Sequence, residues 1–231
     1  MSELTSISEN RFLRNSDLIP QEGLESVSII GLGGIGSSLV QLCALMGFRN
    51  MYGYDPDILD EHNLSTTSYP HDFEGKPKAE AARNVAIDYG CLGEIDFSRA
   101  YFERGKDCYL NPCVMMGPDN MDTRLDVYRS WVEMENREWL IDMRMGALSM
   151  EVITVTKEND DFMSTWNPPS TDIAEPCTAK HTIFTASMVA SLGMGKVFKI
   201  IANRPYYSYI WCGLSPLSVD KTTLIIPKKG D

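Results

Sequence analysis

The sequence lacks the patterns that mark a zinc site, a nucleic-acid-binding surface or a membrane span. Its six cysteines include no C-x-x-C pair, so a structural zinc site has no ligand set of the required spacing. No Lys/Arg-rich run occurs, and the formal net charge of −11 disfavours nucleic acid and anionic membranes as partners. No stretch approaches about 18 uninterrupted apolar residues, and residues 1–15 lack the apolar segment of a secretory signal. We therefore expect a cytoplasmic protein with reduced thiols and with no nucleic-acid or membrane partner.

The length and the order of elements indicate one α/β domain. With 231 residues, 43% of them hydrophobic, the chain can bury the core of one large domain. Short apolar runs alternate with segments of helical spacing, and two strand-like runs close the chain. We predict a doubly wound, mostly parallel, Rossmann-like sheet with a β-rich C-terminal end, in a single domain over 1–231. Residues 1–24 are expected to form an N-terminal arm, and the proline-containing stretch 158–176 a loop or lid.

One complete strand–helix–strand unit surrounds a glycine-rich turn. Residues 27–30 predict a short buried strand, and residues 37–46 have the spacing of a helix that ends at Gly47. A second strand, at 50–54, leads directly into Asp55. The turn between the first strand and the helix reads G-x-G-x-x-G, and its glycines are Gly31, Gly33, Gly34 and Gly36. Backbone N–H groups of such a turn can approach phosphates at the positive end of a helix.

Apolar spacing predicts the remaining elements of the sheet and its helices. A helix with proline at its start follows Pro77, where the missing N–H costs little. Further helices are expected at 123–135 and 178–202. Further strands are expected at 113–116, 139–143, 150–156, 206–211 and 222–226.

The glycine turn alone does not identify the nucleotide, because it also fits proteins that bind NAD, FAD or S-adenosylmethionine. Asp55 stands about 20 residues past the turn, where the fingerprint places a ligand for ribose hydroxyls. Downstream, Asp57, Asn63, Lys78 and Asp119 add an amide, a lysine at a helix start and acids at strand ends. These groups suit a triphosphate with Mg²⁺, and a hydride-transfer site needs none of them. We expect ATP and magnesium, with an NAD(P)-dependent oxidoreductase as the alternative.

Together these segments resemble the ThiF/MoeB family, the adenylylating fold of the ubiquitin-activating enzymes. The similarity runs from about residue 11 to residue 202 and rests on the order and spacing of six segments: Arg11–Arg14, Gly31–Ser37, Asp55–Asp57, Asn63–Leu64, Gly75–Lys78 and Asp119–Arg124. The resemblance implies that Asp55 binds ribose and that Asp119 holds magnesium. It assigns Asn63 and Lys78 to the phosphates and the reaction centre. It also implies a homodimer in which an N-terminal arginine, Arg14 in preference to Arg11, reaches the ATP of the other copy.

Two departures from the family pattern concern the phosphates and a metal. The family usually reads Asn-Leu-x-Arg, with the arginine on the phosphates, whereas this chain has Thr66 at that position. Loss of a guanidinium from a triphosphate site weakens the stabilisation of charge on the phosphates. Either another arginine, such as Arg144, substitutes for it, or the protein is a degenerate nucleotide-binding module without activity. The paired cysteines that bind zinc in many relatives are missing as well.

Cys177 is the thiol with a candidate chemical role. It follows the proline-containing stretch and directly precedes a predicted helix, whose dipole lowers the pKa of a thiol at its N-terminus. His181 follows four residues later. In ubiquitin-activating relatives a similar segment carries the cysteine that accepts the activated carbonyl as a thioester. An ordinary cysteine at a helix start is the alternative, and the sequence leaves both open.

The sequence as a whole predicts ATP-dependent adenylylation of a carboxylate. The expected partner is a ubiquitin-like or small peptide with a C-terminal glycine carboxylate. Lys78, Asp119, Cys177 and Arg14 are the predicted catalytic residues. No general base is required, because a carboxylate is already an anion at neutral pH.

Overall fold

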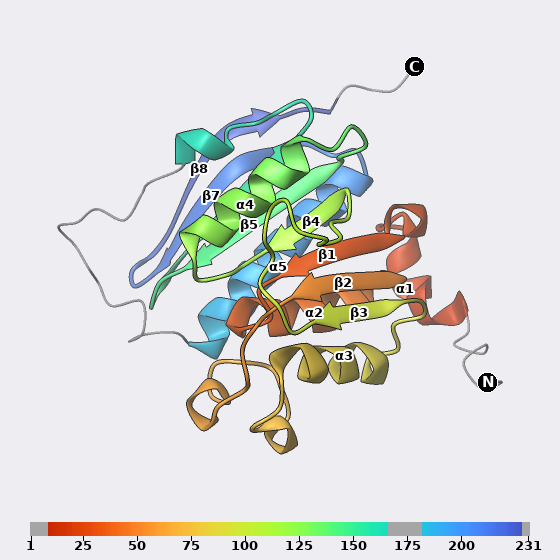
Figure 1. The fold of residues 1–231 in the computed structure, drawn as a ribbon. Helices are drawn as coiled ribbons and strands as arrows, with labels where there is room; N and C mark the ends of the chain where they lie inside the picture. The colour runs from red at the N-terminus through yellow and green to blue at the C-terminus, as the bar shows by residue number, and fades with distance from the viewer. Residues whose placement is uncertain (1–8, 166–181, 228–231) are drawn as a thin grey trace.

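In a computed structural model that describes residues 9–165 and 182–227, eight strands form one sheet in the order β3-β2-β1-β4-β5-β6-β7-β8 (Figure 1). The first five strands are parallel, and β6, β7 and β8 pair antiparallel at one end of the sheet. The strands are β1 (Ser26–Ile30), β2 (Asn50–Tyr54), β3 (Ile95–Ser98), β4 (Cys113–Met116), β5 (Trp139–Met145), β6 (Ser149–Thr156), β7 (Tyr206–Leu214) and β8 (Leu217–Ile225). The predicted α/β class with a mostly parallel sheet and a β-rich C-terminal end is confirmed.

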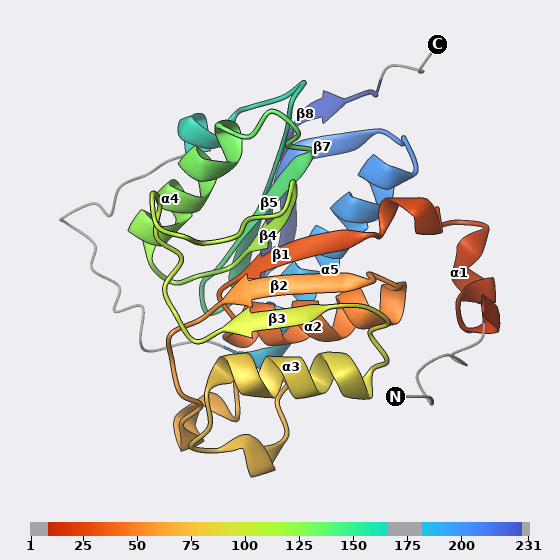
Figure 2. The same cartoon turned by 45° about the vertical axis from the view of Figure 1, so that its right-hand side comes forward.

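Helices cover both faces of the sheet. Helices α2, α3 and α5 lie on one face and α4 on the other (Figures 1 and 2). The α-helices are α1 (Leu13–Ser16), α2 (Gly34–Met46), α3 (Lys78–Asp88), α4 (Met121–Val132) and α5 (Ile183–Ile201). Short 3₁₀ turns are η2 (Glu9–Phe12), η3 (Gln21–Gly23), η4 (Glu61–Asn63), η5 (His71–Phe73) and η6 (Phe162–Thr165). This arrangement places two hydrophobic clusters, one on each side of the sheet.

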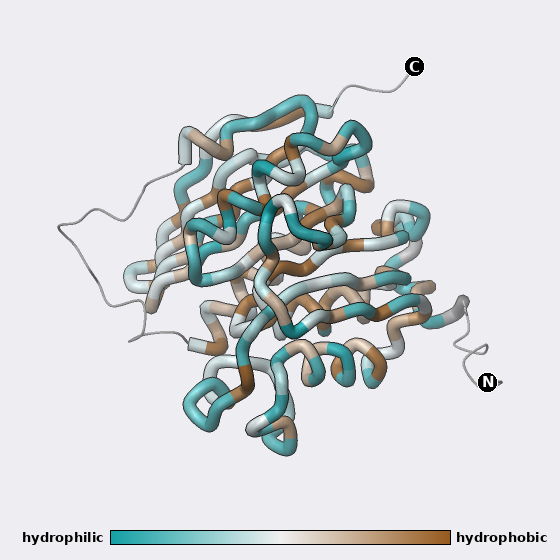
Figure 3. Tube along the Cα trace, viewed as in Figure 1, coloured by the Kyte–Doolittle hydropathy of each residue, from teal (hydrophilic) through white to brown (hydrophobic). Residues whose placement is uncertain are grey.

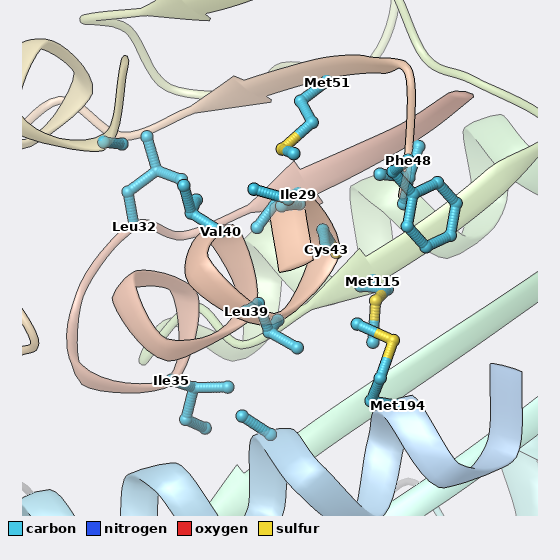
Figure 4. Close-up of a cluster of buried hydrophobic side chains, with 14 of the residues drawn as sticks. Ile29, Leu32, Ile35, Leu39, Val40, Cys43, Phe48, Met51, Met115 and Met194 are labelled. Atoms are coloured by element: carbon cyan, nitrogen blue, oxygen red, sulfur yellow. The ribbon is translucent and has the colours of Figure 1, made fainter. Parts of the chain in front are cut away.

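The central strands are buried because both of their faces meet helices. All four residues of β4 are buried, and so are the last four of β1. On the α2 side, Leu39 and Cys43 lie close to Met115 of the sheet and to Met194 of α5 (Figure 4). Figure 3 shows hydrophobic segments along the central strands and hydrophilic segments on many of the loops. A continuous core under β1 and β4 therefore fixes the carboxyl ends of these two strands relative to each other.

Glycine and proline set several of the predicted boundaries. Gly47 ends α2 with φ of 110°, a left-handed conformation that glycine adopts without a Cβ penalty. Pro77 is the N-cap of α3, as its position in the sequence indicated. Helix α2 begins at Gly34 instead of after Gly36, so the last glycine of the turn belongs to its first helical turn.

Strand β3 is an element that the sequence did not predict. It has four residues, and Ile95 is its one buried side chain. An edge strand with a single buried face carries too short an apolar pattern to be distinguished from a loop.

The N-terminal arm and the predicted loop are described in part. Residues 9–24 contain three short helical turns instead of the irregular chain that was expected. Within 158–176, residues 162–165 form η6, and residues 166–181 lie outside the described part of the structure. Cys177 and His181 are therefore outside it too.

By length and composition α5 is the one helix of the described residues that could cross a membrane. Eight of its residues are nevertheless buried, and it packs against α2, β5 and β6. Such packing is that of a core helix.

Candidate active site

A cavity of about 340 Å³ opens at the carboxyl ends of β1, β2 and β4. The strand order reverses at this place: β2 and β3 follow on one side of β1, and β4 and β5 lie on its other side, which makes it the switch point of the sheet. Ligands of open α/β sheets bind at this switch point, beyond the carboxyl ends of the strands. Of the predicted site residues, the cavity is lined by Gly31, Gly33, Gly34, Asp55, Asp57, Asn63, Lys78 and Asp119.

The positions of the turn require glycine for different structural reasons. Gly31 has φ of +83°, and a Cβ there would lie 2.8 Å from the backbone nitrogen of Pro118. A Cβ on Gly36 would lie 2.0 Å from the carbonyl oxygen of Gly31, so this glycine allows the turn to close on α2. At Gly33 a Cβ would meet no atom within 4 Å. Packing explains Gly31 and Gly36, and the open space beside Gly33 is where a ligand can approach the backbone.

Asp55 is fixed at the end of β2 by hydrogen bonds to the backbone. Its carboxylate accepts from the N–H of Leu32, at 2.7 Å, and from the N–H of Asp57, at 2.9 Å. The residue is 6% exposed, and burial raises the pKa of its carboxyl while the charge of Lys78 opposes that shift. The first of these bonds ties Asp55 to the glycine turn, so turn and carboxylate keep one relative position.

Lys78 brings a positive charge into the same cavity from the first residue of α3. Its Nζ donates to Asp57 Oδ2 at 2.7 Å and lies 4.0 Å from Asp55 Oδ1. Asp57 is more than half exposed, whereas the side chain of Lys78 is about nine-tenths buried. A cation held between two carboxylates at the cavity wall can neutralise a phosphate that enters beside it.

Asn63 and Thr66 line the cavity from the segment around η4. The backbone carbonyl of Asn63 accepts from the N–H of Thr66, at 3.0 Å, and from its hydroxyl, at 3.1 Å. The Asn63 side chain caps η4 by accepting from the N–H of Asp60 at 3.3 Å. Thr66, where the family usually has arginine, therefore lies at the cavity but carries no charge.

Asp119 follows β4 at the far side of the cavity. The next residue, Asn120, is the N-cap of α4, and its side chain accepts from the backbone N–H of Asp122 and Thr123. Asp119 thus stands just before the positive end of a helix, beside the glycine turn. One carboxylate here suits Mg²⁺, which is commonly held by one or two carboxylates together with substrate phosphates and water.

Arg124 of α4 is the arginine that lines this cavity. It is 5% exposed, forms an ion pair with Asp142 of β5, and donates to the carbonyl of Met143 at 3.1 Å. Burial and the nearby charge of Arg144 lower the pKa of Arg124 to about 9, so it is a cation at neutral pH. Buried Asp142 fixes the position of this charge.

Arg144 does not take the position expected of it, because it is absent from the described lining of the cavity. Its Nε donates to Asp142 at 2.8 Å, and its Nη1 donates to the carbonyl of Thr165 at 3.0 Å. Asp142 and Arg144 are two residues apart in β5 and so face the same side of the sheet, and Arg124 reaches the same carboxylate from α4. Of these two arginines Arg124 lines the cavity and Arg144, the example the sequence suggested, does not; that another arginine replaces the missing one stays a prediction.

Helix α1, which carries Arg14 and directly follows the turn with Arg11, lies beside the amino ends of the parallel strands, opposite the carboxyl ends that border the cavity (Figure 2). Arg11 donates to the carbonyls of Tyr89, Gly90 and Ala44, at the ends of α3 and α2. Arg14 in α1 is exposed and makes no hydrogen bond or ion pair within the described residues. Arg11 therefore has a structural role in its own chain, and Arg14 cannot reach the cavity of its own chain.

Sequence reasoning did not single out several residues of the cavity. Tyr101 and Phe102 line it from the chain after β3, a strand that was not predicted. Arg124 was part of the matching segment, but nothing in its spacing separated a cavity arginine from an exposed one. Its position three residues after the helix start at Met121 was the available signal, since that turn faces the strand ends.

The fold and the cavity define a nucleotide-binding α/β protein, in which an acid, a glycine turn and a lysine meet at a switch point. Residues 20–211 match the model of the ThiF family, and the chain belongs to this family. It is a ThiF-like adenylyltransferase, a class that adenylylates carboxylates with ATP. Family membership decides against the NAD(P)-dependent alternative.

Solved structures share the fold at low sequence identity. E. coli MccB aligns with a TM-score of 0.73 and 15% identity, covering 99% of this chain and 72% of MccB. E. coli MccB with ATP aligns at 0.69 and 14%, over 99% of this chain and 75% of the other. PaaA in its selenomethionine form aligns at 0.68 and 16%, over 90% and 67%.

Proposed function

We propose that the protein uses ATP to activate the C-terminal carboxylate of a peptide or a small ubiquitin-like protein. The observation that carries the proposal is the meeting of the glycine turn, Asp55, Lys78 and Asp119 in one cavity. In this proposal Asp55 would bind the ribose, the glycine turn would cradle the phosphates, and Lys78 and Asp119 would face the charged phosphates.

The order of elements along the sheet gives ATP one direction. Tyr101 and Phe102 follow β3, Asp55 follows β2, the glycine turn follows β1, and Asp119 follows β4. The base would therefore lie beside the two aromatic rings and the ribose at Asp55. The phosphates would cross the glycine turn toward Asp119 and Arg124.

The reaction requires in-line displacement at the α-phosphorus. A carboxylate oxygen of the partner forms a bond to this phosphorus while the bond to the oxygen bridging the α- and β-phosphates breaks. An acyl-adenylate forms and pyrophosphate leaves. Lys78 and Arg124 would stabilise the added negative charge, since both are fixed cations at the cavity. Magnesium, held by Asp119, would screen charge on the phosphates.

The solved relatives support a peptide as the partner. Structures of E. coli MccB with MccA are among those that align with this chain, and MccA occurs there with selenomethionine or with isoasparagine at position 7. A partner built of amino acids offers a C-terminal carboxylate. We further propose that Cys177 then accepts the acyl group as a thioester, with AMP as the leaving group. The Cys177→Ser variant below tests this second step separately.

A homodimer would complete the site. Arg14 is exposed, and its helix α1 lies at the amino ends of the strands, whereas the cavity borders their carboxyl ends. A second copy could receive this guanidinium at its phosphates, where Thr66 leaves a charge missing. Mixing Arg14→Ala with Lys78→Ala protein tests this: each variant alone should be inactive, and mixed dimers should regain part of the activity.

ATP–pyrophosphate exchange tests the proposed reaction directly. Exchange is expected with peptides that end in a free carboxylate and not with their C-terminal amides. Asp119→Asn should abolish it, whereas Asp122→Asn, which alters an exposed acid in the first turn of α4 just after it, should not. Cys177→Ser should keep exchange but lose any covalent adduct. ATP binding without exchange for every donor would identify a degenerate module instead.

A further inference from the structure

A second cavity, of about 430 Å³, lies at the antiparallel end of the sheet. It is bounded by η6 and by strands β6, β7 and β8, on the face of the sheet that α4 covers. Its lining includes the carboxylates of Glu151 and Asp161 together with Ser164, Tyr209 and Thr222, and no lysine or arginine is among its described lining residues. We call it the acidic cavity.

The two carboxylates of the acidic cavity are held differently. Glu151 accepts from the hydroxyl of Tyr209 at 3.1 Å, and its other oxygen lies 3.8 Å from Arg144. Burial, together with the negative charges of Glu151 and Asp220, raises the pKa of Tyr209 to about 12. Asp161 has no hydrogen bond or ion pair to its carboxylate within the described residues. The cavity therefore has one acid available and a local excess of negative charge.

A cation that fits here is organic. Within residues 9–165 and 182–227, no group of three or more His, Cys, Asp or Glu side chains could hold a metal ion. Ser164 and Thr222 add hydroxyl oxygens that accept hydrogen bonds, and Ile153 and the ring of Tyr209 offer apolar surface. An ammonium or guanidinium at the end of an aliphatic stem matches both features.

We propose that the acidic cavity binds a lysine or arginine side chain of the peptide whose C-terminal carboxylate the enzyme activates. This inference rests on the proposed function. Arg144 connects the two sites, because it donates to Thr165 at the rim of the acidic cavity and to Asp142, which holds Arg124 at the nucleotide. The formal net charge of −11 also favours encounter with a cationic partner.

Binding of labelled peptides without ATP tests the acidic cavity independently of the reaction. The probes are fluorescein-labelled Gly/Ser decapeptides ending in a free glycine carboxylate, with one lysine moved through positions two to nine. Matched peptides carry norleucine in place of lysine. Fluorescence anisotropy should show about three- to tenfold tighter binding of the lysine peptide at one position. Asp161→Asn should remove that difference and leave norleucine binding unchanged.

A neighbouring acid provides the control. Asp160 accepts from the hydroxyl of Tyr128 at 2.9 Å and does not line the cavity, so Asp160→Asn should keep the lysine preference. Asp161→Lys should reverse the preference, toward a peptide with glutamate at the same position. Equal binding of lysine and norleucine peptides at every position, or no measurable binding of any lysine peptide, would overturn the proposal.

The two proposals fail in different ways. A lysine preference in anisotropy without ATP–pyrophosphate exchange for any peptide would contradict the proposed reaction and support the acidic cavity. Exchange with equal KM for lysine and norleucine peptides would support the reaction and contradict the cavity.

Discussion

Replacement of Asp142 by asparagine should destabilise the fold more than other single changes in the polar interior. Asp142 is fully buried and binds two arginines, Arg124 with Oδ1 and Arg144 with Oδ2. The side chains of these arginines are 6% and 16% exposed. Asp142→Asn preserves the shape of the side chain but removes the charge that both guanidinium groups share.

The expected cost follows from breaking a buried ion pair. Removal of one partner of such a pair costs about 3–5 kcal/mol, because the remaining charge stays buried without compensation. Here two like charges remain close together, and Glu151, at 3.8 Å from Arg144, compensates one of them in part. We expect the free energy of unfolding to fall by about 3–5 kcal/mol, measured by urea denaturation at pH 7 with an unchanged m-value.

Two controls separate charge from packing. Arg144→Met leaves Arg124 and Asp142 as a balanced pair, so its cost should be about 1–2 kcal/mol. Asp160→Asn removes an exposed acid near the surface and should change stability by less than about 1 kcal/mol. A cost of Asp142→Asn below about 1 kcal/mol, or no larger than that of Arg144→Met, would refute the account of a carboxylate that balances two buried cations.

The remaining predictions concern a buried lysine and the glycine turn. Lys196 is 3% exposed, and burial followed by the charge of Lys199 lowers its pKa from 10.5 to about 8. The unfolded chain then binds more protons between pH 8 and 10.5, so stability rises with pH across that window. Lys196→Met should remove the rise and add about 1–2 kcal/mol at pH 7 in urea denaturation, whereas Lys199→Met should keep most of the rise. Gly36→Ala, whose Cβ would lie 2.0 Å from a carbonyl oxygen, should cost about 2–4 kcal/mol and weaken ATP binding. Gly33→Ala should retain the stability of the wild type and still lose ATP affinity by calorimetry, since its Cβ would point into open space of the cavity.

The sequence was sufficient for the parallel part of the fold, apart from the edge strand β3, because its signals are local. The strand predicted at 27–30, the turn and the helix that ends at Gly47 each have their own pattern, and so does Pro77 at the start of α3. Residues that follow strands were therefore expected at one edge of the sheet. Asp55 and Asp119 were predicted to meet on that basis, and they line one cavity.

The parts that the sequence did not predict depend on contacts distant along the chain. Arg144 was the arginine suggested from the sequence, whereas Arg124 lines the cavity, and the difference depends on Asp142 and Thr165, which bind these side chains in three dimensions. Likewise Arg11 is fixed by carbonyl groups at the ends of α2 and α3, which no local pattern reveals. Strand β3 was missed for the same reason, because its one buried residue, Ile95, is fixed by pairing with β2, which is distant along the chain.

The charges of the interior connect the two ends of the sheet. The parallel strands supply the nucleotide cavity, and the antiparallel strands supply the acidic cavity. Between them Asp142 binds Arg124, which lines the nucleotide cavity, and Arg144, which contacts Thr165 and Glu151 of the acidic cavity, so a change at this carboxylate should affect both. A peptide bound at the acidic cavity would contact Thr165 and Glu151, the two groups that hold the far end of Arg144. Because Arg124 and Arg144 both pair with Asp142, a shift of Arg144 should change how strongly this carboxylate binds Arg124. The interaction of Arg124 with a bound phosphate should change as a result. Partner binding and nucleotide affinity should therefore be coupled, with each ligand changing the Kd of the other by the same factor.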